Sequence, residues 1–210
     1  MKLLDLLYPP RCVLCGELLP NSEAPICDFC SRWLFRCQML YRRSKHFSLC
    51  VSPLPYEEPL RHSIHQFKFY GKRYYAKTYG PWLAAAIAQE SLPYDVITWV
   101  PVSRQRYHQR GYDQAEWLAE AAAKELGVTV QRCLKKIHHN PAQSHITDRE
   151  ARAANVKGVY EPVHPNRWSG KRILLIDDII TTGATLEECS RVLLKAGAAM
   201  VHCATLAAAN

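Results

Sequence analysis

The stretch ILLIDDIITTGATL, from Ile173 to Leu186, decides how this chain folds. Four apolar residues run directly into two aspartates, two more apolar residues follow, and a small, hydroxyl-rich turn comes next. A short apolar run of this kind predicts a buried β-strand, and the helical spacing that follows the turn predicts an α-helix. Ligands of open α/β sheets bind beyond the carboxyl ends of the strands, so a site is expected at this turn.

Strand and helix patterns alternate along the chain from about residue 50 onward. The expected strands cover residues 49–56, 94–102, 128–137, 171–179 and 200–207. The expected helices cover residues 58–69, 74–91, 113–127 and 184–198, the second of them disturbed at Gly80-Pro81. Strand, helix and strand in this order predict parallel βαβ units, and therefore an α/β fold with a parallel sheet.

The turn after the aspartates is suited to binding an anion. Its backbone N–H groups lead into a helix N-terminus, and Gly183 allows a ligand to approach closely. Hydroxyl donors come from three threonines, Thr181, Thr182 and Thr185. Asp177 and Asp178 would repel a phosphate, but their carboxylates can accept hydrogen bonds from vicinal hydroxyls. The implied ligand is a 5′-phosphorylated ribose. The alternative, a purely structural strand–turn–helix, leaves the acid pair unexplained.

Nine cysteines are many for one chain, and their spacing indicates a metal site. Four of them form Cys12-x2-Cys15 and Cys27-x2-Cys30, with eleven residues between the pairs. Two CxxC turns can deliver four thiolates to one Zn2+, whereas disulfides or unligated thiols are the alternative. We therefore expect a zinc-binding N-terminal module over residues 1–48 and a second domain over residues 49–210. Cys37 and Cys50 lack CxxC partners, and their role stays open.

The formal charge of +8 favours phosphate-bearing partners, with nucleic acid, nucleotides and anionic membranes all open. The first residues, MKLLDLLYPPRC, lack the apolar run of a signal peptide. No run approaches the roughly 18 apolar residues that a spanning helix needs. The expected location is therefore the cytoplasm, without a membrane span.

Several further motifs occur in a fixed order with the opening stretch. After the four cysteines come FKFYGK (67–72), PVSRQRYHQRGYDQAEWLA (101–119) and QSHITDREARAANVKGVY (143–160). ILLIDDIITTGATL resembles the motif by which type I phosphoribosyltransferases bind phosphoribosyl pyrophosphate (PRPP), and the whole set resembles the ComF/GntX family of phosphoribosyltransferase-like proteins. The resemblance implies a type I phosphoribosyltransferase-like parallel sheet with helices on both faces, plus a small N-terminal four-cysteine zinc module.

The resemblance also assigns roles to residues. Asp177 and Asp178 would hold the ribose hydroxyls, and the 5′-phosphate would lie on Thr181, Thr182, Gly183, Ala184 and Thr185. The loop of Val102, Ser103 and Arg104 would meet the pyrophosphate, which brings Mg2+ with it. Basic and lid residues would be Arg106, Arg110, Arg149 and Arg152. Solvated charges on a loop are the alternative for the first two, and side chains on the surface of a helix are the alternative for the last two. Asp113 replaces a common Asn and is expected to cap a helix.

Two functions compete. An active phosphoribosyltransferase would need an acceptor site, yet the third acid typical of purine-salvage relatives is replaced by Thr181. The other reading is handling of single-stranded DNA, because residues 41–46 and 67–77 interleave cations with aromatics; inward-packed aromatics on a solvated helix are the alternative. The resemblance implies natural transformation, with PRPP, incoming single-stranded DNA at the inner face of the cytoplasmic membrane, and other DNA-uptake proteins as partners. No catalytic residue is assigned.

Overall fold

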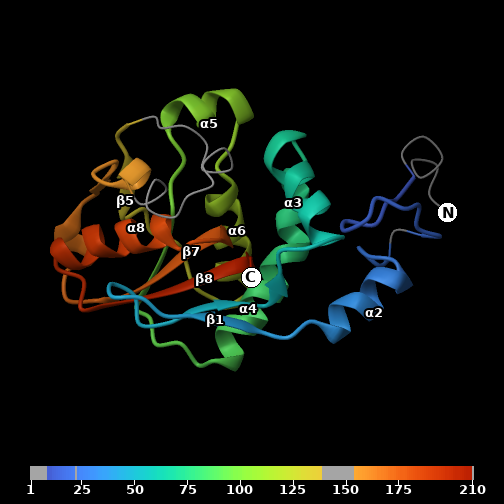
Figure 1. Cartoon of the computed structure of the whole chain (residues 1–210), viewed down its shortest axis with the longest axis horizontal. Coiled ribbons are helices and arrows are strands. Elements are labelled where there is room, and N and C mark those ends of the chain that lie inside the picture. Colours follow the sequence, from blue (N-terminus) through green and yellow to red (C-terminus); the bar gives the residue numbers. More distant parts are fainter. Residues whose placement is uncertain (1–8, 22, 139–153, 210) are drawn as a thin grey trace.

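The structure, a computed structural model, describes residues 9–21, 23–138 and 154–209. A six-stranded sheet in the order β1-β2-β8-β7-β4 forms its centre, and β3 also pairs with β8 (Figure 1). β1 runs antiparallel to β2, whereas all other neighbours in this sheet are parallel. The strands are β1 (Leu40–Arg42), β2 (Cys50–Ser52), β3 (Leu54–Pro55), β4 (Val96–Trp99), β7 (Arg172–Ile180) and β8 (Met200–Ala208).

Helices cover both faces of this sheet, and a small ribbon of two strands lies beside it. The ribbon consists of β5 (Leu134–Lys136) and β6 (Tyr160–Pro162). The α-helices of the described residues are α2 (Asp28–Arg36), α3 (Leu60–Phe69), α4 (Ala76–Gln89), α5 (Arg104–Arg110), α6 (Gln114–Glu125) and α8 (Ala184–Lys195). Two 3-10 turns, η1 (Arg73–Tyr75) and η3 (Pro165–Arg167), complete the described elements.

The run of four apolar residues that opened the sequence argument is buried on both faces of β7. Leu174 and Ile176 belong to the core formed with α3, α4 and α6, whereas Ile173 and Leu175 belong to the core formed with α8 and β6. The strand is enclosed laterally because β4 and β8 pair with it on its two sides. The predicted α/β sheet with helices on both faces is thus confirmed.

Helix α4 passes through Gly80-Pro81 without a break, so the predicted disturbance there is wrong. Gly80 has a packing role: a Cβ at this position would lie 2.5 Å from the Cβ of Ala121 on α6. The missing side chain lets α4 and α6 approach closely. Pro81 is the sixth residue of the helix, so its missing N–H removes one intrahelical hydrogen bond, yet the helix continues to Gln89.

Three further expectations need correction. Of the strand expected over residues 128–137, only β5 forms, and it pairs with β6 instead of the main sheet; Val130 makes a single bridge to Ile97. The strand expected over residues 49–56 is divided into β2 and β3, because Pro53 lies between them and cannot donate to a ladder. The sequence analysis also missed helix α5, whose seven residues carry no apolar stripe.

The N-terminal segment packs against α3 (Figure 1). Val13 and Leu14 are buried in the same core as Leu60 and Ile64, and the hydroxyl of Ser63 donates a hydrogen bond to the carbonyl oxygen of Val13. β1 lies before residue 48 yet is hydrogen-bonded into the main sheet. The division into residues 1–48 and 49–210 therefore stays a prediction. None of the described helices is long and apolar enough to cross a bilayer.

Candidate ligand site at the end of strand β7

The predicted phosphate turn joins β7 directly to α8. The strand ends at Ile180, the helix begins at Ala184, and Gly183 adopts a φ of 81° at the N-cap. This left-handed conformation favours glycine, because an L side chain is strained there. Asp177 and the turn line a hollow that is open to solvent. Its lining residues are Asp177, Ile179, Ile180, Thr181, Gly183, Ala184, Thr185 and Leu186. The structure therefore brings the first acid and most of the turn together in one concave site.

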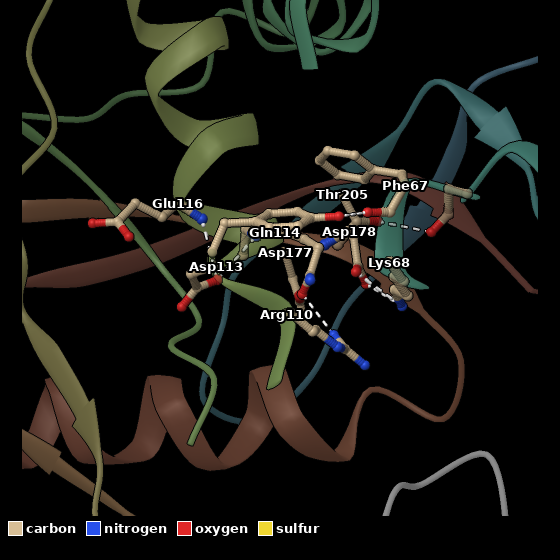
Figure 2. A network of polar contacts seen from close by, with 12 residues as sticks. Phe67, Lys68, Arg110, Asp113, Gln114, Glu116, Asp177, Asp178 and Thr205 are labelled. Atoms are coloured by element: carbon tan, nitrogen blue, oxygen red, sulfur yellow. Dashed lines mark hydrogen bonds and ion pairs between the residues drawn. The ribbon is translucent and has the colours of Figure 1, made fainter. Parts of the chain in front are cut away.

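The two aspartates have different surroundings, although they are adjacent in sequence. Successive side chains of a strand point to opposite faces, so Asp177 follows Leu175 toward α8 and Asp178 follows Ile176 toward α3. On the α3 side, the Nζ of Lys68 lies 2.9 Å from the Asp178 carboxylate (Figure 2). Both side chains are largely buried, with 23% and 12% of their surface exposed. A ligand hydroxyl that binds Asp178 has to share this carboxylate with Lys68 or displace it.

Asp177 accepts a hydrogen bond from the backbone N–H of Asp178, at 2.8 Å. Burial raises the pKa of the Asp177 carboxyl well above its usual range, and the neighbouring charge of Asp178 raises it further. The acid pair thus combines a carboxyl whose pKa is raised by burial with a carboxylate that is paired to Lys68.

The predicted pyrophosphate loop lies next to the start of α6. The N–H of Val102 donates to Asp113 at 2.9 Å, and the hydroxyl of Ser103 accepts from the N–H of Arg106 as the N-cap of α5. Arg104 is the first residue of α5, and the assignment of Val102, Ser103 and Arg104 to the pyrophosphate stays a prediction. Asp113 caps α6 as predicted, through Ala115 and Glu116. One carboxylate therefore holds both the loop and the helix.

Burial raises the pKa of Asp113 from 3.8 to about 6, against the lowering effect of its backbone N–H donors. The stability that this group contributes is therefore greatest at low pH and is lost as pH rises through about 6. We expect Asp113→Ala to lower the free energy of unfolding by about 1–2 kcal/mol at pH 7.5, because a helix cap is lost. The loss should be roughly 1 kcal/mol larger at pH 5. Urea unfolding at both pH values measures it.

Ser103→Ala is the matched control for this prediction, since it removes the cap of α5 without removing a titrating group. Its cost should be the same at the two pH values. An Asp113→Ala cost that does not change with pH would contradict the assigned pKa.

The two described arginines of the basic set lie on α5. The guanidinium of Arg110 lies 4.7 Å from the ring centroid of Phe69, and its Nη1 donates to the Oε1 of Gln114 at 2.7 Å. Burial lowers the pKa of Arg110, and the charge of Asp178 opposes that shift. Arg110 is therefore not merely a solvated charge, because it connects α5 to the end of α3. Arg149 and Arg152 lie outside the described residues.

Exposed aromatic side chains and cations gather around the end of α3 and α5. The exposed aromatics of this set are Phe69 (58%), Tyr70 (61%), Tyr74 (51%) and Tyr107 (47%). Lys72 lies over the Tyr74 ring, and Arg110 over Phe69. We call these six residues the aromatic–basic surface. In contrast, Phe67 and Tyr75 are buried, so the run at residues 67–77 is divided between core and surface.

The other basic run, residues 41–46, is mostly committed to contacts within the protein. Tyr41 donates to Glu90 at 2.7 Å, Arg42 donates to the carbonyl oxygen of Ala209, and Ser44 and His46 both bind the carboxylate of Glu187. These contacts attach the β1–β2 connection to the first turns of α8. Because these side chains already have partners within the protein, residues 41–46 are disfavoured as the nucleic-acid surface.

Four cysteines form the one group of this kind among the described residues that could hold a metal ion. The Sγ atoms of Cys12, Cys15, Cys27 and Cys30 all lie within 4.8 Å of one another. The Sγ atoms of Cys15 and Cys27 are 3.7 Å apart, close to the ~3.8 Å between sulfurs of a tetrahedral zinc site with 2.3 Å Zn–S bonds. The residues therefore fit a metal such as zinc.

The thiols of the cluster differ in their surroundings, because burial raises the pKa of Cys15 and of Cys30. Burial opposes ionisation of the Cys12 thiol, but backbone hydrogen bonds from Cys15, Cys27 and Leu14 lower its pKa to about 7. Cys37 lies outside the cluster and donates to the carbonyl oxygen of Trp33, whereas Cys50 is buried in β2. Among the described residues, neither forms part of a second metal site.

Comparison with known proteins agrees with this geometry. Residues 113–210, which include α6, β7, the turn, α8 and β8, match the phosphoribosyl transferase domain family. The predicted type I phosphoribosyltransferase-like fold is thus confirmed.

Curated relatives extend over most of the chain. It is 28% identical to "Competence protein F" of Haemophilus influenzae, with 89% of this chain and 92% of the relative covered. It is also 28% identical to "DNA utilization protein YhgH" of Salmonella typhi (94% and 96% covered), and 27% identical to "Competence protein ComFC" of Bacillus subtilis (90% and 73% covered). The resemblance to ComF proteins that the motifs indicated is confirmed.

The structure adds two cations that the sequence analysis did not assign to the site. Lys68 binds Asp178, although its motif FKFYGK had been noted only for the resemblance and for its aromatic-basic composition. Lys136 of β5 is influenced by the charge of Asp177. No local pattern marks either residue, because each approaches β7 from a distant part of the chain.

Proposed function

We propose that this protein binds PRPP at the end of β7 and serves natural competence by handling incoming single-stranded DNA. The observation that carries the proposal is that Asp177 and most of the Thr-Thr-Gly-Ala-Thr turn line one hollow, with Asp178 as the next residue of the strand. The carboxyl groups suit the vicinal hydroxyls of a ribose, and the backbone N–H groups of the turn suit its 5′-phosphate. The names of the relatives, with competence and DNA utilization, support the biological setting.

The ligand at the acid pair is expected to be a free ribose phosphate, not a DNA strand. Deoxyribose lacks the 2′-hydroxyl, and the 3′-oxygen inside a strand is esterified, so a strand offers no vicinal diol. DNA is therefore assigned to the aromatic–basic surface, which adjoins the acid pair through α3. Bases stack on exposed aromatic rings while cations pair with phosphates. Lys68 and Phe69 are consecutive residues, so the two sites share one helix end.

Cofactors follow from the same arrangement. The four-cysteine cluster would hold Zn2+ as a structural ion, and Mg2+ would accompany the pyrophosphate and neutralise part of its charge. Val102, Ser103 and Arg104 are the proposed contacts of that pyrophosphate, with Arg106 and Arg110 as neighbouring cations. The cytoplasm, at the inner face of the cytoplasmic membrane, is the proposed location, with other DNA-uptake proteins as further partners.

An active phosphoribosyltransferase is the second candidate, because the domain match covers the PRPP motif. Such an enzyme needs an acceptor nucleophile close to the ribose C1. The third acid that would orient a base is replaced by Thr181, which is exposed at the end of β7. Release of pyrophosphate from PRPP on addition of a panel of bases and amines would favour this candidate.

The proposed DNA function is tested by fluorescence anisotropy of a labelled single-stranded oligonucleotide. We expect binding that weakens steeply with salt, since phosphate contacts release counterions. Phe69→Ala and Tyr70→Ala should each weaken binding by roughly tenfold, because a stacked base is worth about 1–3 kcal/mol. Phe35→Ala is the matched control: this side chain is 92% exposed on α2, away from the aromatic–basic surface.

The outcome separates the candidates. Equal losses in Phe35→Ala and Tyr70→Ala would indicate nonspecific adhesion and remove the assigned surface. Absence of binding at low salt would contradict the DNA function, while calorimetric binding of PRPP would remain as a separate result.

A further inference from the structure

Lys136 is a lysine of the β5–β6 ribbon that is partly buried without an acidic partner. In β5, side chains alternate between the two sides of the ribbon. Lys135 points outward and forms a 2.9 Å ion pair with Glu161, each side chain being 48% exposed. Lys136 points to the other side, and among the described residues its contact is the ring of Tyr160, 5.3 Å from the ammonium to the ring centroid. No hydrogen bond or ion pair of its ammonium occurs there.

Placing an ammonium in this environment is unfavourable. Burial lowers the pKa of Lys136 to about 8. Lysines are seldom buried unless they are paired, so an anion bound beside Lys136 would stabilise its charge. The neighbouring Lys135 shows that the ribbon can place a lysine in an ordinary surface ion pair.

The charged and titratable groups around Lys136 come from four elements. Arg106 of α5 disfavours its charge, whereas Asp177 of β7 and Cys189 of α8 favour it, and Tyr160 of β6 lies beneath it. β6 also packs against α8. These elements carry the acid pair, the phosphate turn and the residues next to the predicted pyrophosphate loop. The ribbon that carries Lys136 packs through β6 on α8, which is the helix that begins at the phosphate turn (Figure 1).

We propose that Lys136 binds the pyrophosphate group of PRPP. This inference rests on the proposed function and adds a residue to it. The 5′-phosphate already has the backbone N–H groups and hydroxyls of the turn, but the more highly charged pyrophosphate needs further cations. Arg106 and Lys136 repel each other without a ligand, and a bound pyrophosphate converts this repulsion into two attractions.

Calorimetric titration with PRPP and Mg2+ tests the inference on the full-length wild-type protein and the variants Lys136→Met and Lys135→Met. We expect Lys136→Met to weaken PRPP binding by roughly tenfold or more, as for the loss of a charge-assisted hydrogen bond. Lys135→Met should stay within about twofold of wild type, because its surface ion pair contributes little. The affinity for inorganic pyrophosphate should be lowered in Lys136→Met and nearly unchanged in Lys135→Met. The affinity for ribose 5-phosphate should be the same in both variants.

The pH dependence provides a readout that a structural role would not affect. Wild-type affinity for pyrophosphate should fall as pH rises through about 8, where Lys136 loses its proton. Lys136→Arg stays charged throughout, so comparison with it removes the ligand's own protonation. Lys136→Arg should also bind pyrophosphate with the affinity of the wild type. If Lys136→Met proves unstable, this variant distinguishes the loss of charge from the loss of folding.

Each result has one meaning. Equal PRPP affinity in Lys136→Met and Lys135→Met overturns the inference and leaves the proposed function standing. A wild-type protein that binds neither PRPP nor pyrophosphate contradicts the proposed function itself. Weaker binding of ribose 5-phosphate by Lys136→Met would show that Lys136 binds the 5′-phosphate, and would overturn its assignment to the pyrophosphate.

Discussion

Asp178→Ala is expected to weaken PRPP binding by at least about 100-fold. Two hydrogen-bond acceptors for the ribose are lost, and Lys68 is left as a largely buried cation without its partner. The second effect also lowers stability, because an unpaired buried charge is unfavourable. Calorimetric titration with PRPP and Mg2+, together with urea unfolding, measures both consequences.

A double variant separates these consequences. In Lys68→Met/Asp178→Ala the unpaired ammonium is absent, so stability should recover while PRPP binding stays lost. Asp95→Ala is the matched control: Asp95 pairs with Arg172 at the opposite end of β7, with Nη2 and Oδ1 2.6 Å apart. It should leave PRPP affinity unchanged. Recovery of PRPP binding in the double variant would show that Asp178 serves to neutralise Lys68 and does not hold the ribose.

Cys30→Ser is expected to remove bound zinc and lower the melting temperature by about 10 °C or more. Structural zinc contributes directly to folding, and a loss of only ~3–5 kcal/mol gives a change of this size in a chain of this length. Cys12, Leu14 and Cys30 are buried in the same core as α3 and α4, so the loss should reach beyond the N-terminal segment. Zinc content per chain and thermal unfolding are the measurements.

Cys37→Ser is the control for the zinc prediction, because Cys37 lies outside the four-cysteine cluster and only donates to the carbonyl oxygen of Trp33. It should retain one zinc per chain. A Cys30→Ser protein with full zinc content and an unchanged melting temperature would contradict the assigned role of the cluster.

Local patterns in the sequence predicted the elements around the site. The run ILLI with its flanking turn predicted β7 and α8, and Asp113 was expected as the cap that it proves to be. Pro53, by contrast, interrupts an apolar run, and the short basic helix α5 has no apolar stripe, so periodicity failed at both. Patterns of this kind report only which side chains face the core.

The sequence by itself determined that two acids precede a glycine-containing, hydroxyl-rich turn, and that four cysteines occur at metal-ligand spacing. Only the tertiary structure decided that the two acids have different partners, with Asp178 paired to Lys68 across 110 residues of chain and Asp177 half-buried on the α8 side. It also decided that the charge of Asp177 acts on the pKa of Lys136. Strand geometry separates neighbouring side chains onto opposite faces, and the packing of helices on each face selects their partners. Such partners are set by contacts between distant segments, which no local spacing encodes.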